Sequence, residues 1–235
     1  MRKVTFPLMP AGSEKPNTPK TDELADWIKS VKGINADIIS WEIETTLKDQ
    51  IGAADICCGG GDFYRFRFDN LKNFDDVIAD VHFAQRVCKN IKWSMPSPSD
   101  LGAADEDEIS EFSKLYRDMR DAGVVSHILL CRSPTEIELE KFNSVKYLWL
   151  TDDSSIESVL EHSGDIAADV KTITRIESLF DSYDIRNIFV MDADRKTLEN
   201  VLEFIDREHI FITGIAPEDN RHEYWKKLSE VSVMI

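Results

Sequence analysis

No apolar run in this sequence approaches the roughly 20 residues that a helix needs to cross a bilayer. The first ten residues, MRKVTFPLMP, hold too short an apolar stretch for a secretory signal peptide, so we expect a cytoplasmic protein. Positive charge is also scarce: 28 Lys and Arg stand against 44 Asp and Glu, a formal net charge of −16. Such a surface repels phosphate backbones and anionic lipid, which excludes nucleic acid and membranes as expected partners.

Cysteine is rare, and its spacing is uninformative about metals. The four cysteines stand at positions 57, 58, 88 and 131, and no two of them have the C-x-x-C spacing that zinc and redox sites favour. The adjacent Cys57 and Cys58 could respond to oxidation, but we expect reduced, partly buried thiols.

The apolar residues that are present form short runs separated by segments of helical length. With 235 residues and 42% hydrophobic content, the chain is long enough for one core, and we expect a single domain over 1–235. The runs are RKVTFPLM, ADIISWEI, IKWSM, SHILLC, VKYLWL, DIAADVK, IRNIFVM and HIFITGI.

Regular alternation of strands and helices defines the expected fold. From Ser126 onward the runs begin near 126, 146, 166, 186 and 209, and each gap has apolar residues at helical spacing. Eight strand–helix units predict an α/β protein, a closed parallel (β/α)₈ TIM barrel with helices outside. A leucine-rich solenoid would need a recurring Leu ladder that is missing. Of the two alternatives to the barrel, an open doubly wound sheet is therefore the stronger.

The gap between Trp41 and Ile91 leaves the third strand open. Aromatic residues and arginines alternate at strand period in DFYRFRFD, so either residues 63–69 or residues 91–95 could form this strand. The triplet Gly59–Gly61 just before it favours a flexible connection over a phosphate loop, because no helix is expected to follow immediately.

In a closed barrel, chemistry is expected at the carboxyl ends of the strands and in the loops that follow them. The irregular segments 10–20 and 96–108 both follow strands and should lie on that face. The five histidines do not, so we expect no histidine-rich metal site. The strand-end candidates are Glu42, Glu44, Ser94, Arg132, Asp152, Asp153, Lys171, Asp192, Asp194 and Thr213.

Lys171 is the most specific of these candidates. A lysine just after IAADV would be partly desolvated, which lowers the pKa of a lysine and makes its amine nucleophilic toward a carbonyl group. An ion pair with Asp169 is the simpler alternative. If the chain is an enzyme, we expect Lys171 to carry the chemistry and Asp192 and Asp194, on the next strand, to move protons or hold substrate.

Glu42 and Glu44 are two positions apart, so on a strand they share one face. If that face is the barrel interior, buried carboxylates need a cation, an Arg or a Lys beside them. Arg65, Arg67 and Lys171 are the expected partners. The two arginines and Arg132 are also the expected substrate-binding cations, and the residues by themselves predict no cofactor.

Two stretches resemble Schiff-base barrel enzymes. KVTFPLMP followed by ADIISWEIETTLKDQI is similar to the start of type I 3-dehydroquinate dehydratases, and ADVKT resembles the sixth-strand lysine segment of those enzymes and of deoxyribose-phosphate aldolase. The resemblance implies a lyase acting on a keto acid or sugar phosphate. Under it Lys171 would be the amine, and Glu42 or Glu44 would orient the substrate.

A second resemblance involves the same residues. PNTPKTDELADWIKSVKGINADIISWEIETTLKD is similar in rhythm to glycerophosphodiester phosphodiesterases. It implies that Glu42 and Glu44 hold a divalent cation through carboxylate oxygens in a metal-dependent hydrolase.

The third hypothesis is a non-catalytic acidic barrel that binds a protein partner or a second copy of itself. The net charge of −16 suits it, as does the lack of the histidines that both families use.

Overall fold

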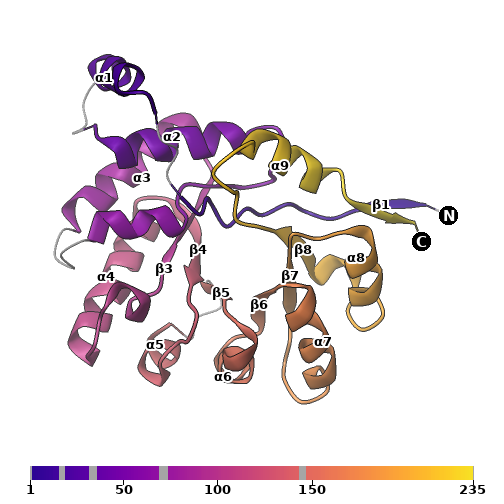
Figure 1. The fold of residues 1–235 in the computed structure, drawn as a ribbon. Coiled ribbons are helices and arrows are strands. Elements are labelled where there is room, and N and C mark those ends of the chain that lie inside the picture. Colours follow the sequence, from indigo (N-terminus) through magenta and orange to yellow (C-terminus); the bar gives the residue numbers. More distant parts are fainter. Residues whose placement is uncertain (1, 16–18, 32–35, 69–73, 143–146, 235) are drawn as a thin grey trace.

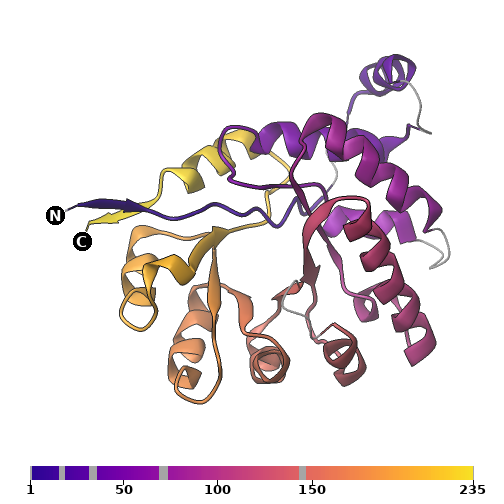
Figure 2. The same ribbon diagram turned by 180° about the vertical axis from the view of Figure 1, so that it is seen from behind.

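A computed structural model describes residues 2–15, 19–31, 36–68, 74–142 and 147–234. Its main sheet has seven parallel strands in sequence order, and helices lie around the outside of this curved sheet (Figures 1 and 2). The strands are β2 (Cys57–Cys58), β3 (Ile91–Pro96), β4 (Val124–Leu130), β5 (Tyr147–Leu150), β6 (Asp165–Ala168), β7 (Asn187–Met191) and β8 (Ile210–Thr213). The strand–helix alternation predicted from Ser126 onward is confirmed.

Nine α-helices occur in the described ranges, and none of them is long and apolar enough to cross a membrane. They are α1 (Thr21–Ser30), α2 (Ile38–Gln50), α3 (Asp75–Val87), α4 (Glu106–Asp121), α5 (Glu136–Lys141), α6 (Ile156–His162), α7 (Val170–Leu179), α8 (Arg195–Val201) and α9 (Arg221–Ser229).

The prediction of a closed eight-stranded sheet is wrong. β1 (Lys3–Thr5) pairs antiparallel with β9 (Ser232–Met234) in a separate two-stranded sheet, so the two ends of the chain lie side by side (Figure 1). The chain after β1 runs along β8 and bonds to it at alternate residues, for example from Met9 N–H to the Ile212 carbonyl and from Ala11 N–H to the Gly214 carbonyl, both at 2.8 Å. It forms an isolated bridge with β8 rather than an eighth strand of the sheet.

Glycines let the irregular first segment approach β2 and β3 closely. A Cβ on Gly12 would lie 1.8 Å from the Gly60 carbonyl oxygen, and one on Gly60 would lie 1.9 Å from the Ser94 carbonyl oxygen. Ser13 therefore bridges to Gly61 on one side and to Ala216 on the other. The glycine triplet serves close backbone packing, and a 3-10 helix rather than an α-helix follows it.

The prediction that the segment ADIISWEI forms a strand is wrong, because this segment is the start of α2. The Asp37 carboxylate accepts a hydrogen bond from Ser40 N–H at 2.8 Å and caps the helix. Ile39, Ile43 and Leu47 then recur at fourfold spacing and are all buried. A short apolar run satisfies both helical and strand periods, and here the cap and the following residues favour the helix.

DFYRFRFD is not a strand either. Residues 62–68 form a 3-10 helix that buries Phe63, Tyr64 and Phe68 and exposes Phe66, and position 69 lies outside the described residues. Residues 91–96 are β3, which settles the open question of the third strand, and β2 takes the place expected for the second.

Alternate strand residues face two different surroundings. One set, which includes Trp93 and Trp149, points outward and packs between the sheet and the helices. The other set forms a smaller cluster on the inner face and includes Ile128, Leu130 and Ala167. At the edge of that inner cluster Leu150, Phe189 and Ile215 are only partly buried. The inner face is thus apolar and reachable by solvent near β5–β8.

Candidate functional site

Glu42 and Glu44 do not share a face. They lie on α2, where residues two apart point in different directions. Glu42 is fully buried in an ion pair with Arg221 and accepts a hydrogen bond from Thr46 Oγ1 at 3.0 Å. Glu44 accepts one from Trp27 Nε1 at 2.8 Å. The shared carboxylate face on which a metal or substrate-orienting role depended is therefore absent.

Arg221 is the partner of Glu42 that the sequence did not reveal. It begins α9, is 3% exposed, and also donates to the Lys15 carbonyl at 2.6 Å and the Pro217 carbonyl at 3.2 Å. Its separation of 179 positions from Glu42 leaves no local signal. The ion pair joins α2 to α9 across the irregular first segment, and we interpret its role as structural.

Arg67 is also engaged in packing. Its guanidinium donates to Asp80 Oδ2 at 2.8 Å and to Asp37 Oδ2 at 2.6 Å, and the Tyr64 hydroxyl donates to the same Asp80 oxygen. Burial raises the pKa of Asp80 to about 6 in spite of Arg67. Substrate binding by Arg67 stays a prediction, but both of its carboxylate partners are already in place.

Arg65 and Arg132 lie near Asp100, beyond the carboxyl ends of β2, β3 and β4. Arg65 pairs with Asp62, and the Arg132 N–H donates to Asp100 Oδ2 at 3.3 Å. Burial raises the pKa of Asp100, and both arginines act against that rise. The predicted role of the two arginines in anion binding stays a prediction, now with an acid beside them.

Lys171 lies in the first turn of α7 and is exposed. The helix is capped by the Asp169 carboxylate, which accepts from Thr172 N–H at 2.8 Å. The desolvation from which a nucleophilic Lys171 was inferred is therefore absent. Asp152 likewise uses its carboxylate locally, accepting from Ser154 N–H at 3.2 Å, and Thr213 donates to the Met9 carbonyl at 2.7 Å.

Lys92, which the sequence pattern did not single out, is the buried lysine of the inner face. It is 2% exposed, and within the described ranges its Nζ atom has no hydrogen-bond partner. Burial lowers the pKa of Lys92 to about 8. Ser94, two residues along β3, is also buried, and its Oγ has no hydrogen-bond partner among the described residues. For Lys92, the one sequence signal was its position inside a run with the alternating period of a strand.

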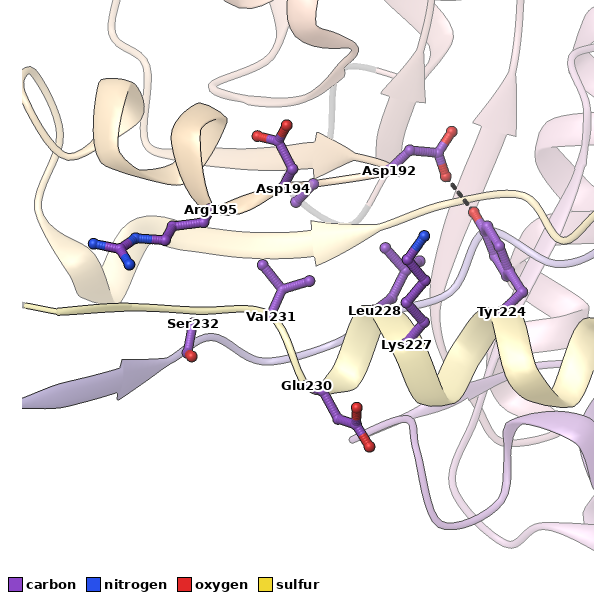
Figure 3. A pocket seen from close by; sticks show the side chains of 10 residues that line it. Asp192, Asp194, Arg195, Tyr224, Lys227, Leu228, Glu230, Val231 and Ser232 are labelled. Carbon is purple, nitrogen blue, oxygen red and sulfur yellow. Dashed lines mark hydrogen bonds between the residues drawn. The ribbon is translucent and has the colours of Figure 1, made fainter.

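Asp192 has the most unusual backbone among the sequence-predicted residues. It directly follows β7 at a φ of 47°, a left-handed conformation that is uncommon outside glycine. Its N–H donates to the Thr213 carbonyl at 3.0 Å, and its carboxylate accepts a hydrogen bond from the Tyr224 hydroxyl (Figure 3). A Cβ on Gly214 would lie 2.1 Å from that hydroxyl oxygen, so the glycine makes room for the pair.

This pair lies on the wall of a pocket of about 450 Å³ between α8 and α9, called here the α8–α9 pocket. Lys227 and Tyr224 point toward the same end of it as Asp192 (Figure 3). Burial and the bond to Asp192 raise the pKa of Tyr224, which keeps its hydroxyl a donor at neutral pH. The complete lining is Asp192, Ala193, Asp194, Arg195, Tyr224, Lys227, Leu228, Glu230, Val231 and Ser232.

Asp194 also lines this pocket, but its carboxylate has a different role from that of Asp192. Its Oδ1 accepts from Thr197 N–H and Oγ1, both at 2.7 Å, and so caps α8. The backbone bond from Thr197 lowers the pKa of Asp194. The structure thus brings Asp192 and Asp194 to one pocket, away from Glu42. Across the described ranges, no three His, Cys, Asp or Glu side chains are grouped to hold a metal ion.

Comparison with solved structures finds proteins of similar fold. A B12-independent methionine synthase from Shewanella sp. W3-18-1, in complex with selenomethionine, superposes with a TM-score of 0.59 and 14% sequence identity, over 96% of each chain. The likeness shows the fold alone. No protein-family model and no curated protein matches the chain.

The match corrects the family resemblances drawn from the sequence. The similar structure is neither a dehydroquinate dehydratase, an aldolase nor a phosphodiesterase, and the segment ADIISWEI, on which both resemblances relied, is a helix. What remains is a barrel-like α/β fold of a kind found in an enzyme.

Proposed function

We propose that the protein binds a small amphipathic amine, with an apolar amino acid as the model ligand, in the α8–α9 pocket. The carrying observation is the Asp192–Tyr224 pair at the carboxyl end of β7. A left-handed aspartate costs about 1–3 kcal/mol unless its surroundings fix it, and such residues gather at ligand sites. The carboxyl ends of barrel strands are also where this fold class places its sites.

The charges at one end of the pocket suit a ligand with an ammonium and a carboxylate. Oδ1 of Asp192 is bonded to Tyr224, while Oδ2 has no hydrogen-bond partner in the described part of the chain and can accept from an ammonium group. Lys227, at the same end, can pair with a carboxylate (Figure 3). Leu228, Val231 and Ala193 offer apolar surface for a side chain.

The similar methionine synthase was crystallised with an amino acid, selenomethionine. At 14% identity this adds a compatible ligand class and no residue correspondence.

Calorimetric titration with methionine, leucine and N-acetylmethionine tests the proposal. We expect the free amino acids to bind and the acetylated one, which lacks the ammonium, to bind at least tenfold more weakly. Asp192→Asn keeps a residue that tolerates the left-handed backbone and should weaken binding about tenfold. Asp181→Asn, an exposed residue elsewhere, is the matched control and should change nothing.

Two results would overturn the proposal. One is the failure of both free amino acids to bind, and the other is binding that Asp192→Asn leaves unchanged. Lys227→Met sharpens the assignment, because it should weaken methionine but not methionine methyl ester, whose carboxylate is blocked.

A further inference from the structure

Two cysteines that are 31 positions apart in sequence meet in space. Cys57 lies in β2 and is buried, whereas Cys88 follows the last residue of α3 and is partly exposed. Cys57 belongs to the apolar cluster between the sheet and the helices, and Cys88 packs against the same cluster. Cys88 is near enough to raise the pKa of the Cys57 thiol, and its own Sγ donates to the Asn90 carbonyl oxygen at 3.5 Å. Both thiols are free.

The topology explains this contact. Cys57 is the register partner of Ile91, the first residue of β3, and Cys88 lies three positions before Ile91 in the turn that connects α3 to β3. The adjacent Cys58 belongs to the inner-face cluster and is completely buried. Successive strand residues point to opposite faces, which separates Cys58 from the pair.

We propose that Cys57 and Cys88 are an oxidation site at which a peroxide forms a reversible intramolecular disulfide. The Cys88 thiolate attacks one peroxide oxygen, giving a sulfenic acid and water. Cys57 sulfur then attacks the Cys88 sulfur, its proton leaves with the departing hydroxide as water, and the S–S bond forms. Two thiols and one hydrogen peroxide give one disulfide and two waters.

Exposure sets the order of these steps. Cys88 meets solvent, while burial, Cys88 and Cys58 together raise the pKa of Cys57 to about 12, so Cys57 does not react first. The Lys92 side chain acts in the opposite direction and favours the Cys57 thiolate. Once Cys88 is oxidised, the pairing of Cys57 with Ile91, three positions after Cys88, keeps Cys57 close enough to resolve it.

Peptide mapping after brief hydrogen peroxide treatment and alkylation tests the site. We expect the tryptic peptide 49–65 to become linked to 87–89 with the loss of two hydrogens, and dithiothreitol to reverse the link. Because 49–65 holds both Cys57 and Cys58, the experiment is repeated with Cys58→Ser. The link should persist in Cys58→Ser and Cys131→Ser and disappear in Cys88→Ser.

A link through Cys58 or Cys131 would overturn the proposal. So would the conversion of Cys88 to sulfinic acid without any crosslink, or a disulfide that joins two copies of the chain. Cys57→Ser adds a second test, and if burial makes that variant unfold, the wild-type, Cys58→Ser and Cys88→Ser results still decide. The site is separate from the α8–α9 pocket, so its failure would leave the proposed ligand site unaffected.

Discussion

Helix α9 carries two polar contacts of opposite character, three residues apart. Arg221 is buried, and its guanidinium is shared between Glu42 and backbone carbonyls. Tyr224 is partly exposed and donates to one oxygen of Asp192 at the edge of a pocket. A contact with all its bonding capacity used inside the protein stabilises the fold, whereas one that leaves an oxygen open to a pocket can serve a ligand.

The same contrast applies to arginines predicted from the sequence. Arg67 lies between two carboxylates and has the environment of Arg221, while Arg65 and Arg132 remain at the carboxyl ends of the strands. Residue type alone therefore does not separate a structural arginine from one available to an anion. The burial of the arginine side chain and the number of its partners separate the two kinds.

Breaking the buried pair should have the largest effect. Arg221→Met leaves the Glu42 carboxylate buried without its cation, and we expect unfolding free energy to fall by about 3–5 kcal/mol. Urea denaturation measures the loss. Replacing both residues, Glu42→Met with Arg221→Met, should recover a large part of it, because no uncompensated charge remains. A loss of unfolding free energy below about 1 kcal/mol in the single variant would contradict a structural role for the buried Glu42–Arg221 pair.

The second buried pair should produce a pH dependence. The pKa of Asp80 is about 6 in the folded protein and near 3.9 in an unfolded chain, so the folded state holds the proton more tightly. The stabilisation from this proton is therefore greatest below pH 4 and is lost as pH rises through 6. The expected loss is about 3 kcal/mol over that window.

Urea midpoints measured from pH 4 to 8 check this dependence. Asp80→Asn, which cannot ionise, should remove the part that belongs to this carboxyl group and leave the part caused by the net negative charge. An identical pH profile in the variant would show that Asp80 does not titrate in this range.

Tyr224→Phe should have the smallest effect on stability. The variant loses one partly exposed hydrogen bond, so we expect less than about 1 kcal/mol of destabilisation. If the pocket binds an amine, affinity should still change several-fold, because the Asp192 carboxylate is no longer held in place. Denaturation and titration of the same sample separate the two effects, and a loss as large as that of Arg221→Met would remove the contrast within α9.

The later half of the chain was predictable because its signals are local. Each apolar run from β4 to β8 is bounded by a polar turn and followed by residues at helical spacing, so every unit could be recognised alone. The positions of Asp192 and Asp194 after β7 followed directly. Their different tasks did not, since whether a carboxylate caps a helix or faces a pocket depends on the backbone angles at that residue.

The sequence by itself determined the α/β class, the order of β4 to β8 and the net charge of −16. Only the tertiary structure decided that residues 38–50 form a helix, that Glu42 pairs with Arg221, and that Lys92 rather than Lys171 is the buried lysine. The physical reason is that periodicity acts between neighbours in sequence, whereas burial and ion pairing depend on segments as far apart as α2 and α9. A short apolar run or a single charge carries no record of which distant segment will cover it.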